Sequence, residues 1–435
     1  MTSKTSEPGA DEPQARALLS AAAVRSAAHR MLELALAGSL SEWRVDLDRL
    51  PAVADYVAAL TRERFPQLDV PMHARWRHFV FDGRDLWQES VARCDWPDAA
   101  TRARAAFDLA ITSVLLDAGA GPDWRYTDRA TGVVASRSEG LALASLRWFE
   151  SGALSDRARP ASQADERARG PRAGALGAAA RSPPALRADA DALARVDAQA
   201  LNTAFQVTPD NPLVGAASRA VLMNRLGLAV QARPDVFAIA DTPRPGGLFD
   251  ALVQRAGAEP LRAAVVLEML LETLGPIWTG RPSLGGVSLG DCWPHPALGY
   301  VPFHKLSQWL AYSLIEPLEA AGVRVTGLEE LTGLPEYRNG GLFVDMGVLV
   351  PRNGAALQQP HAVSTPFVIE LRALTVALLD RIAPLVATRL GLASDGYRLA
   401  RVLEGGTWAA GRRIAREKRG DGTPPFQISS DGTVL

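Results

Sequence analysis

The spacing of apolar residues along the chain predicts a mainly helical fold. Between residues 50 and 64, Val53, Tyr56, Val57 and Leu60 recur at steps of three and four, which places their side chains on one face of a helix. A similar alanine- and leucine-rich texture covers residues 15–36, 261–274 and 367–390. Runs typical of β-strands are short, at residues 323–325, 348–350 and 426–428. The predicted fold class is therefore mainly α with small β elements.

Changes in amino-acid composition along the chain predict how it divides into segments. Residues 1–14 are polar and are expected to be a disordered N-terminus, and residues 15–154 are predicted to form a first helical part. Residues 155–187 consist largely of arginine, alanine, serine, proline and glycine without periodicity, which is typical of a flexible loop or linker. Residues 188–435 form a second helical part with most of the candidate motifs. We expect the two helical parts to make one continuous domain.

Composition and charge narrow the class of protein. The 435 residues are 47% hydrophobic and 22% charged, a balance typical of a globular protein. The formal net charge of −1 gives no general attraction to nucleic acid or to an anionic membrane, so we expect neither as a partner. The sequence shows no long uncharged apolar run and no apolar signal peptide. Cys94 and Cys292 form no CxxC pair, which fits a reducing compartment, and we expect a soluble, cytoplasmic protein.

Residues 71–79 concentrate groups suited to a sugar phosphate. Histidines, arginines and aromatic residues alternate within this short stretch. Arginine binds phosphate oxygens through two parallel hydrogen bonds, and an aromatic ring offers a flat face to a sugar or a base. Arg75, Trp76 and His78 are therefore candidate binding residues. The alternative is an arginine pair at the surface beside a core tryptophan.

A second region, from about residue 278 to 316, joins a glycine-rich loop to a helix. Asp291, Cys292, His295 and His304 match no structural zinc spacing, and the chain has no HExxH motif, so no metal is expected. The glycines form neither a GxGxxG motif after a strand nor a phosphate-binding loop, so no nucleotide cofactor is expected.

The helix of this region is predicted to begin near Lys305. Lys305, Gln308 and Tyr312 lie three to four residues apart, on one face of that helix. Such a face can present a cation, an amide and a phenol to one polar ligand. The alternative is an ordinary solvated face. The nearby Trp293 and His304 favour a site.

Residues 328–345 lead through acidic, aromatic and glycine residues to a single acid. A short helix is predicted to end at Gly333, and Glu336 to Gly341 supply the residues of a hairpin turn. Three bulky apolar residues then precede Asp345. A carboxylate held at the edge of a buried pocket can stabilise positive charge or activate water, so Asp345 is a candidate catalytic group. The alternative is that Asp345 caps a following helix.

Two local patterns bear on this interpretation. The Leu-x-Gly-Leu-Pro start at Leu331 is similar to the helix-hairpin-helix of base-excision glycosylases, in which a Val-Asp-Thr-type step carries the catalytic aspartate. Val344-Asp345-Met346 stands in a comparable place, although closer to the hairpin. The similarity implies, as one alternative for the fold, a core like that of the helix-hairpin-helix glycosylases. Near the C-terminus, Glu404 and Trp408 either line the pocket or only fix a junction between two helices, where Thr407 is a candidate N-cap.

Several blocks together resemble the uracil catabolism protein 4 family. They are residues 75–79, 210–215, 290–293, 301–310, 333–345 and 403–413. The resemblance implies a role in the reductase-independent route of uracil breakdown, which proceeds through ribosylated intermediates. It also implies action on ribosylurea, with release of urea from the sugar.

Cleavage of an N-ribosyl bond passes through an oxocarbenium-like state, which needs a carboxylate near the anomeric carbon and a positioned water. We predict Asp345 as that carboxylate, followed by Glu336 and then Asp291. The predicted substrate-binding residues are Arg75, Trp76, His78, Trp293, His304, Lys305, Gln308, Tyr337 and Arg338. The predicted function is hydrolysis of ribosylurea or its 5-phosphate, with a small ribosylated substrate as partner and without a cofactor.

Two other functions stay open. The first is a non-catalytic ligand-binding or scaffold protein of the uracil-degradation pathway. The second is an amidohydrolase acting on a ring-opened pyrimidine, which the missing metal motif disfavours.

Overall fold

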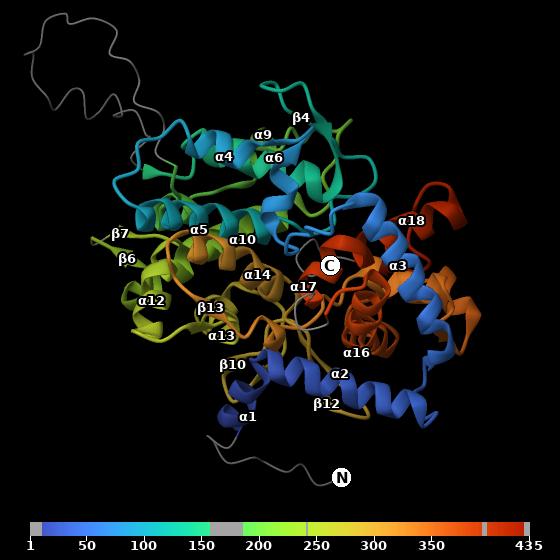
Figure 1. The fold of residues 1–435 in the computed structure, drawn as a ribbon. Helices are drawn as coiled ribbons and strands as arrows, with labels where there is room; N and C mark the ends of the chain where they lie inside the picture. Colours follow the sequence, from blue (N-terminus) through green and yellow to red (C-terminus); the bar gives the residue numbers. More distant parts are fainter. Residues whose placement is uncertain (1–10, 157–185, 241, 394–397, 430–435) are drawn as a thin grey trace, which may run out of the picture. The chain divides into compact units, whose positions relative to one another are not determined.

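The described chain folds into helices and short strands (Figure 1). These elements belong to two compact units. The computed structural model describes residues 11–156, 186–240, 242–393 and 398–429. Unit 1 comprises residues 1–74, 259–315 and 324–435, and unit 2 comprises residues 75–258 and 316–323. Residues 1–10 of the predicted disordered N-terminus and 157–185 of the predicted linker lie outside the described residues. The expectation of one continuous domain stays a prediction.

Unit 1 is mainly helical. Its α-helices are α1 (Asp11–Leu18), α2 (Ala21–Leu36), α3 (Leu50–Arg64), α13 (Ala263–Leu274), α14 (Lys305–Ala320, which continues into unit 2), α15 (Tyr337–Asp345), α16 (Pro366–Leu390), α17 (Leu399–Val402) and α18 (Trp408–Arg419). Short 3₁₀ turns are η1 (Leu47–Arg49), η4 (Gly275–Ile277), η5 (Leu328–Glu330) and η6 (Gly354–Gln358), and η7 (Leu403–Thr407) is a π-helical turn.

The strands of unit 1 are short and pair two by two. They are β1 (Trp43–Val45), β8 (Leu261–Arg262), β9 (Ser283–Leu284), β10 (Val287–Ser288), β11 (Cys292–His295), β12 (Gly299–Pro302), β13 (Val325–Thr326), β14 (Leu349–Pro351), β15 (Pro360–Ala362) and β16 (Gln427–Ser429). Antiparallel pairs are β1 with β14, β9 with β10 and β11 with β12, whereas β8–β13 and β15–β16 are parallel. The mainly α fold class with small β elements is therefore confirmed.

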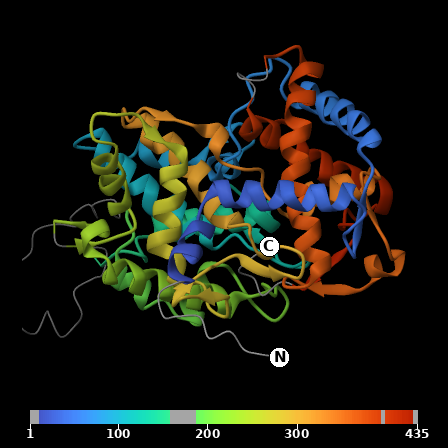
Figure 2. The same ribbon diagram turned by 90° about the horizontal axis from the view of Figure 1, so that it is seen from below.

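Helix α16 organises the core of unit 1, where α2 and α3 pack against it (Figure 2). Most of its residues from Phe367 to Leu379 are fully buried, as expected for a largely apolar helix in the core. The buried Glu370 carboxylate accepts hydrogen bonds from the backbone amides of residues 41–43. Further along the helix, Asp380 pairs with Arg25 of α2 at 3.0 Å. Polar anchors thus fix how α16 sits among its neighbours.

The predicted helices of unit 1 agree closely with the observed ones. Helix α3 has the predicted bounds, and α16 begins one residue earlier than predicted. The predicted helix 15–36 is divided at Ser20, whose hydroxyl accepts a hydrogen bond from the Ala23 amide and so caps α2. The first two residues of the predicted helix 261–274 instead form β8, because they pair with β13.

Two local predictions were wrong. Residues 336–341 form no hairpin turn: α15 runs through them, and Glu336 caps its start. Gly340 has no side chain, which lets the backbone of α15 pack closely against Thr375 of α16. Thr407 makes no capping hydrogen bond, since α17, η7 and α18 follow one another without a break. A glycosylase-like core stays a prediction.

Unit 2 is also helical. Its helices are α4 (Leu86–Val91), α5 (Ala99–Leu115), α6 (Arg137–Glu150), α8 (Ala190–Ala194), α9 (Ala198–Ala204), α10 (Ala216–Ala232), α11 (Pro234–Phe237) and α12 (Gly247–Ala256), with the 3₁₀ turn η2 (Arg75–Phe79). Its strands form the hairpins β2–β3 (Val80–Phe81, Arg84–Asp85), β4–β5 (Tyr126–Thr127, Val134–Ala135) and β6–β7 (Ala238–Ile239, Thr242–Pro243). Within the described residues of both units, no helix has the length and apolar character that a membrane crossing requires.

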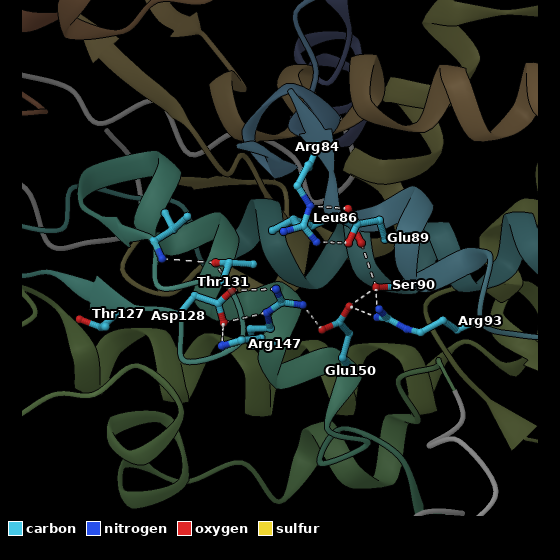
Figure 3. Close-up of polar contacts among 12 residues, drawn as sticks. Arg84, Leu86, Glu89, Ser90, Arg93, Thr127, Asp128, Thr131, Arg147 and Glu150 are labelled. Carbon is cyan, nitrogen blue, oxygen red and sulfur yellow. Dashed lines mark hydrogen bonds and ion pairs between the residues drawn. The ribbon is translucent and has the colours of Figure 1, made fainter. Parts of the chain in front are cut away.

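A network of ion pairs ties one hairpin of unit 2 to its helices (Figure 3). Arg147 of α6 holds Asp128, beside β4, through two hydrogen bonds of 3.0 and 2.7 Å, and it also contacts Glu150 at 2.6 Å. Glu150 in turn accepts a hydrogen bond from Ser90 of α4. Every carboxylate in this chain of contacts faces an arginine or a hydroxyl, so we assign the network a structural role.

Candidate functional site

The segment that leads into α15 is held rigidly by side chains from other elements of unit 1. The Gln308 side chain accepts a hydrogen bond from the Thr332 amide at 3.0 Å and donates one to the Thr332 hydroxyl. Tyr312 donates to the Thr332 carbonyl at 3.2 Å, and Arg25 donates to the Leu331 carbonyl at 2.8 Å. Gln308 and Tyr312 are fully buried and position the segment, and contact of either residue with a ligand stays a prediction.

Asp291 supports the same segment through Arg372. Its carboxylate accepts two hydrogen bonds from Arg372 at 2.8 and 2.7 Å, one from the Trp293 indole at 2.9 Å and one from the Lys305 amide at 3.1 Å. Arg372 also donates to the Pro335 carbonyl at 3.1 Å. Burial raises the pKa of Asp291, but the attraction and hydrogen bonds of Arg372 outweigh it and hold that pKa far below its usual range. The Asp291 carboxylate is therefore ionised, and the positive charge of Arg372 balances its negative charge.

Glu336, the second predicted carboxylate, stands at the end of this segment and begins α15. One of its oxygens accepts a hydrogen bond from the Asn339 amide at 2.6 Å, and the other accepts one from the Arg338 amide at 2.8 Å. The residue is only 8% exposed, and no cationic side chain pairs with it in the part of the chain that the structure describes. The printed contacts that stabilise a negative charge on Glu336 are therefore two amides at the start of a helix, where the helix dipole adds to them.

Arg338 lies in the first turn of the same helix. Its guanidinium lies over the Trp408 ring at 4.8 Å and over the Tyr337 ring at 5.1 Å. The side chain is 5% exposed and forms no ion pair with any described carboxylate. Helix α18 lies close to the Arg338 backbone. A Cβ at Gly411 would lie only 2.1 Å from the Arg338 carbonyl oxygen, so glycine is needed there for this geometry. A buried arginine stacked in this way is suited to bind a polar or anionic group.

His73 and Glu404 form a further pair beside these aromatic rings. The Nδ1 atom of His73 lies 2.8 Å from a Glu404 oxygen, and its ring stacks on Trp309 at 5.9 Å and lies 6.3 Å from the Trp408 ring. Glu404 belongs to the π-helical turn η7, a form of helix that is frequent at functional sites. His73 belongs to the stretch 71–79 that was predicted to suit a sugar phosphate, and Glu404 and Trp408 were predicted either to line the pocket or to fix a helix junction.

Two buried polar side chains, Thr407 of the π-helical turn and Asn339 of α15, each have one atom without a hydrogen-bond partner within the described residues. These atoms are the Thr407 hydroxyl and the Asn339 side-chain oxygen, and both residues are almost fully buried. Buried polar atoms are normally paired, so a ligand or a water molecule is expected to complete them. No hydrophobic periodicity signals a π-helical turn, and its one indication in the sequence is the glycine pair before Thr407.

Asp345, the first predicted carboxylate, has a different environment. It is the last residue of α15, and its two oxygens accept hydrogen bonds from Arg419 at 2.7 and 2.6 Å. Its negative charge is therefore compensated, unlike that of Glu336. A catalytic role for Asp345 stays a prediction.

The predicted residues Arg75, Trp76 and His78 belong to unit 2. Arg75 is fully buried and donates hydrogen bonds to Asp117 and Ser113 at 2.8 and 2.7 Å. Its guanidinium thereby joins η2 to α5. Trp76 is nearly buried against Phe79 and Trp87, and His78 is buried as well. Contact of these residues with a substrate stays a prediction.

The motifs near residues 291, 308 and 336 thus converge within unit 1, around the start of α15. Of the other predicted residues, Trp293 supports Asp291, Lys305 contributes its amide to the same carboxylate, and His304 is buried. In the ranges that the structure covers, no three histidine, cysteine or acidic side chains are grouped as a metal site would require.

Fold and site together define a mainly α protein in which a buried carboxylate starts a helix beside a stacked arginine and two tryptophans. The chain belongs to the family described as "Protein of unknown function (DUF1688)", whose model matches residues 17–170 and 172–435. It is 36% identical over 427 residues to "Protein urg3" of Schizosaccharomyces pombe, covering 96% of this chain and 98% of that protein. It is 34% identical over 439 residues to "Uracil catabolism protein 4" of Lachancea kluyveri, covering 92% and 93%. The family resemblance is thereby confirmed.

Proposed function

We propose that the protein acts in uracil breakdown and hydrolyses the N-ribosyl bond of ribosylurea, or of its 5-phosphate, to release urea. The pathway is suggested by the name of the Lachancea kluyveri relative, which aligns along nearly the whole chain. The reaction is suggested by one observation, the buried carboxylate of Glu336, whose charge no described cation neutralises. Heterolysis of an N-ribosyl bond places positive charge on the sugar, and such a carboxylate is a fixed countercharge for it.

Glu336 would have two tasks in this reaction. As the bond between the anomeric carbon and nitrogen breaks, its electron pair leaves with the urea nitrogen, and the carboxylate stabilises the oxocarbenium-like sugar. A water molecule then adds to the anomeric carbon and gives a proton to Glu336. That proton passes to the urea nitrogen, so the net reaction consumes one water and needs no external acid. The two helix amides that hold the carboxylate keep it oriented throughout.

The groups around Glu336 match the rest of the substrate. The Arg338 guanidinium would donate hydrogen bonds to the ureido oxygen or, in the 5-phosphate, to a phosphate oxygen. Trp408 and Trp309 offer flat faces to the sugar. The His73–Glu404 pair supplies further hydrogen bonds for ribose hydroxyls. A role as amidohydrolase has no comparable support, because no described group of side chains is arranged for a metal.

The test is urea release from synthetic ribosylurea and from its 5-phosphate by the purified full chain. We expect turnover of at least one of them, and absence of urea from both refutes the proposal. Binding of either compound without turnover would instead favour the non-catalytic ligand-binding alternative.

Two matched variants then separate the carboxylates. Glu336→Gln keeps one oxygen for the helix amides but loses the charge, and we expect urea release to fall by at least about 100-fold, as for loss of an acid–base group. Asp345→Asn, its matched control, should retain most of the activity, because Arg419 already neutralises that carboxylate. The reverse result would return the catalytic role to Asp345 and leave the reaction unchanged.

A further inference from the structure

A cavity of about 160 Å³ lies within unit 2, where α4, α5 and the end of α14 contribute to its lining. Every lining residue belongs to unit 2, whereas Glu336 and Arg338 of the proposed hydrolytic site belong to unit 1. The lining includes the exposed residues Gln88 and Ala99, so a ligand can enter from solvent. An engineered cavity of about 150 Å³ binds benzene, so the space in unit 2 is large enough for one aromatic ring.

Two tryptophans supply flat faces to this cavity. Trp76 of η2 and Trp87 of α4 are each 5% exposed, and their ring centroids lie 5.7 Å apart with the planes inclined at 36°. Helix α5 contributes Ala99, Ala103 and Ala106, which recur at steps of four and three and so share one face. Because alanine fills little volume, this face leaves room for a flat ligand that packs against the indole rings.

The charged side chains of the lining indicate which kind of ring the cavity suits. Glu316 of α14 accepts a hydrogen bond from Arg77 at 2.5 Å, so these two charges balance each other. The Asp85 carboxylate accepts a hydrogen bond from the Gln88 amide at 3.0 Å and caps α4, whose first turn stabilises its charge.

Arg102 of α5 is the remaining charged residue of the lining. It is partly exposed, and its side chain forms no hydrogen bond or ion pair with any residue in the ranges that the structure describes. The one charge of the lining that lacks a partner is therefore positive. An arginine in this state can bind a carboxylate through two parallel hydrogen bonds.

We propose that this cavity binds a small aromatic or heteroaromatic carboxylate, whose ring packs against Trp76 and Trp87 and whose carboxylate pairs with Arg102. A neutral ring would leave Arg102 unmatched, and a cationic ring would be repelled by it. The ligand is thus a molecule other than the proposed hydrolytic substrate, and its binding in unit 2 needs no turnover in unit 1.

Ligand-observed NMR titration of the full chain tests the charge preference with benzoate, benzamide and benzamidine. These probes have nearly the same shape and are anionic, neutral and cationic near neutral pH. We expect benzoate to bind about tenfold more tightly than benzamide, as for one added charge-assisted hydrogen bond, and benzamidine to bind most weakly. Cyclohexanecarboxylate keeps the charge without the flat ring and should bind more weakly than benzoate. Absence of benzoate binding, or binding of any of the other three as tight as that of benzoate, overturns the proposal.

Variants locate the binding site. Arg102→Gln should weaken binding of benzoate by about tenfold and leave that of benzamide unchanged, because only the charged contact is lost. Arg129→Gln is the matched control, since Arg129 is an exposed arginine of unit 2 outside the lining. It should change neither affinity. Ala103→Leu fills the cavity and should abolish binding of both probes, with circular dichroism as the check of its fold.

Arg102→Gln keeps the test decisive even if Ala103→Leu does not fold, because the Arg102 side chain holds no described part of the structure in place. Benzoate binding that is unchanged in Arg102→Gln, or equally weakened in Arg129→Gln, overturns the proposal. Failure of the urea-release assay, in contrast, bears only on the hydrolytic function.

Discussion

Replacement of Asp291 by asparagine should destabilise unit 1 strongly. Arg372 is only 2% exposed in its side chain, and Asp291 is its sole ion-pair partner among the described residues. Asparagine removes the charge, and its amide group faces a donor of Arg372 or Trp293 whichever way it turns. Breaking a buried pair by removing one partner costs about 3–5 kcal/mol. We expect a loss of about 3 kcal/mol, because the 15% exposure of Asp291 lets water reach part of the guanidinium.

Guanidinium chloride unfolding, followed by tryptophan fluorescence and circular dichroism, measures this loss. Glu63→Gln is a matched control, since Arg413 holds Glu63 in the same two-bonded geometry at 2.8 and 3.1 Å but Glu63 is 60% exposed. We expect the control to unfold at the same denaturant concentration as the natural protein. The double variant Asp291→Leu with Arg372→Met should be more stable than Asp291→Asn, because no charge remains buried. Equal midpoints for Asp291→Asn and the control would refute this reasoning.

The pH dependence of the same difference has a definite sign. The pKa of Asp291 is lower in the folded protein than in the unfolded chain, so its ionised form contributes stability above the unfolded pKa of about 3.9. That contribution is lost as the pH falls through the folded value. The difference between the natural protein and Asp291→Asn should therefore be constant from about pH 8 to 5 and shrink below about pH 4. A difference that grows on acidification contradicts the assignment.

Three further outcomes are expected. Gly406→Ala places a Cβ 2.3 Å from the Val57 side chain and should lower the free energy of unfolding by about 1–3 kcal/mol, measured by denaturant titration. Tyr312→Phe removes the hydrogen bond to the Thr332 carbonyl and should cost about 1 kcal/mol in the same assay, so an unchanged stability would count against that bond. Arg338→Met should raise the KM for ribosylurea or its 5-phosphate far more than it lowers kcat, and an effect on kcat alone would contradict a binding role.

Much of the helical fold could be predicted from the sequence, because amphipathic and buried helices carry their signal locally. The predicted bounds of α3 are the observed ones, and α16 differs by a single residue at its start. The error in residues 336–341 has a physical cause. Glycine pairs favour turns in isolation, but Glu336 caps a helix there, and helix α16 packs close enough to require a small residue at Gly340. Tertiary packing overrode local propensity.

The site was harder to predict than the fold, because its pairings join residues far apart in the chain. Asp291 was selected as a candidate, but its partner Arg372 lies 81 positions away in a helix that looked purely structural. His73 and Glu404 are separated by 331 positions, and neither belongs to a pattern that names the other. Spacing within a motif shows which residues share a helix face. It does not show which carboxylate is left without a cation.

The interleaving of the two units has a consequence for biosynthesis. Arg25 and Asp380, which join α2 to α16, are separated by 355 positions, and Asp345 needs Arg419 near the end of the described chain. During translation the N-terminal helices of unit 1 must therefore wait without their partners until almost all of the chain has left the ribosome. Residues 75–258, which supply most of unit 2, are complete much earlier. We expect nascent unit 1 to be the part of this protein that depends on chaperones, since its apolar helix faces stay exposed the longest.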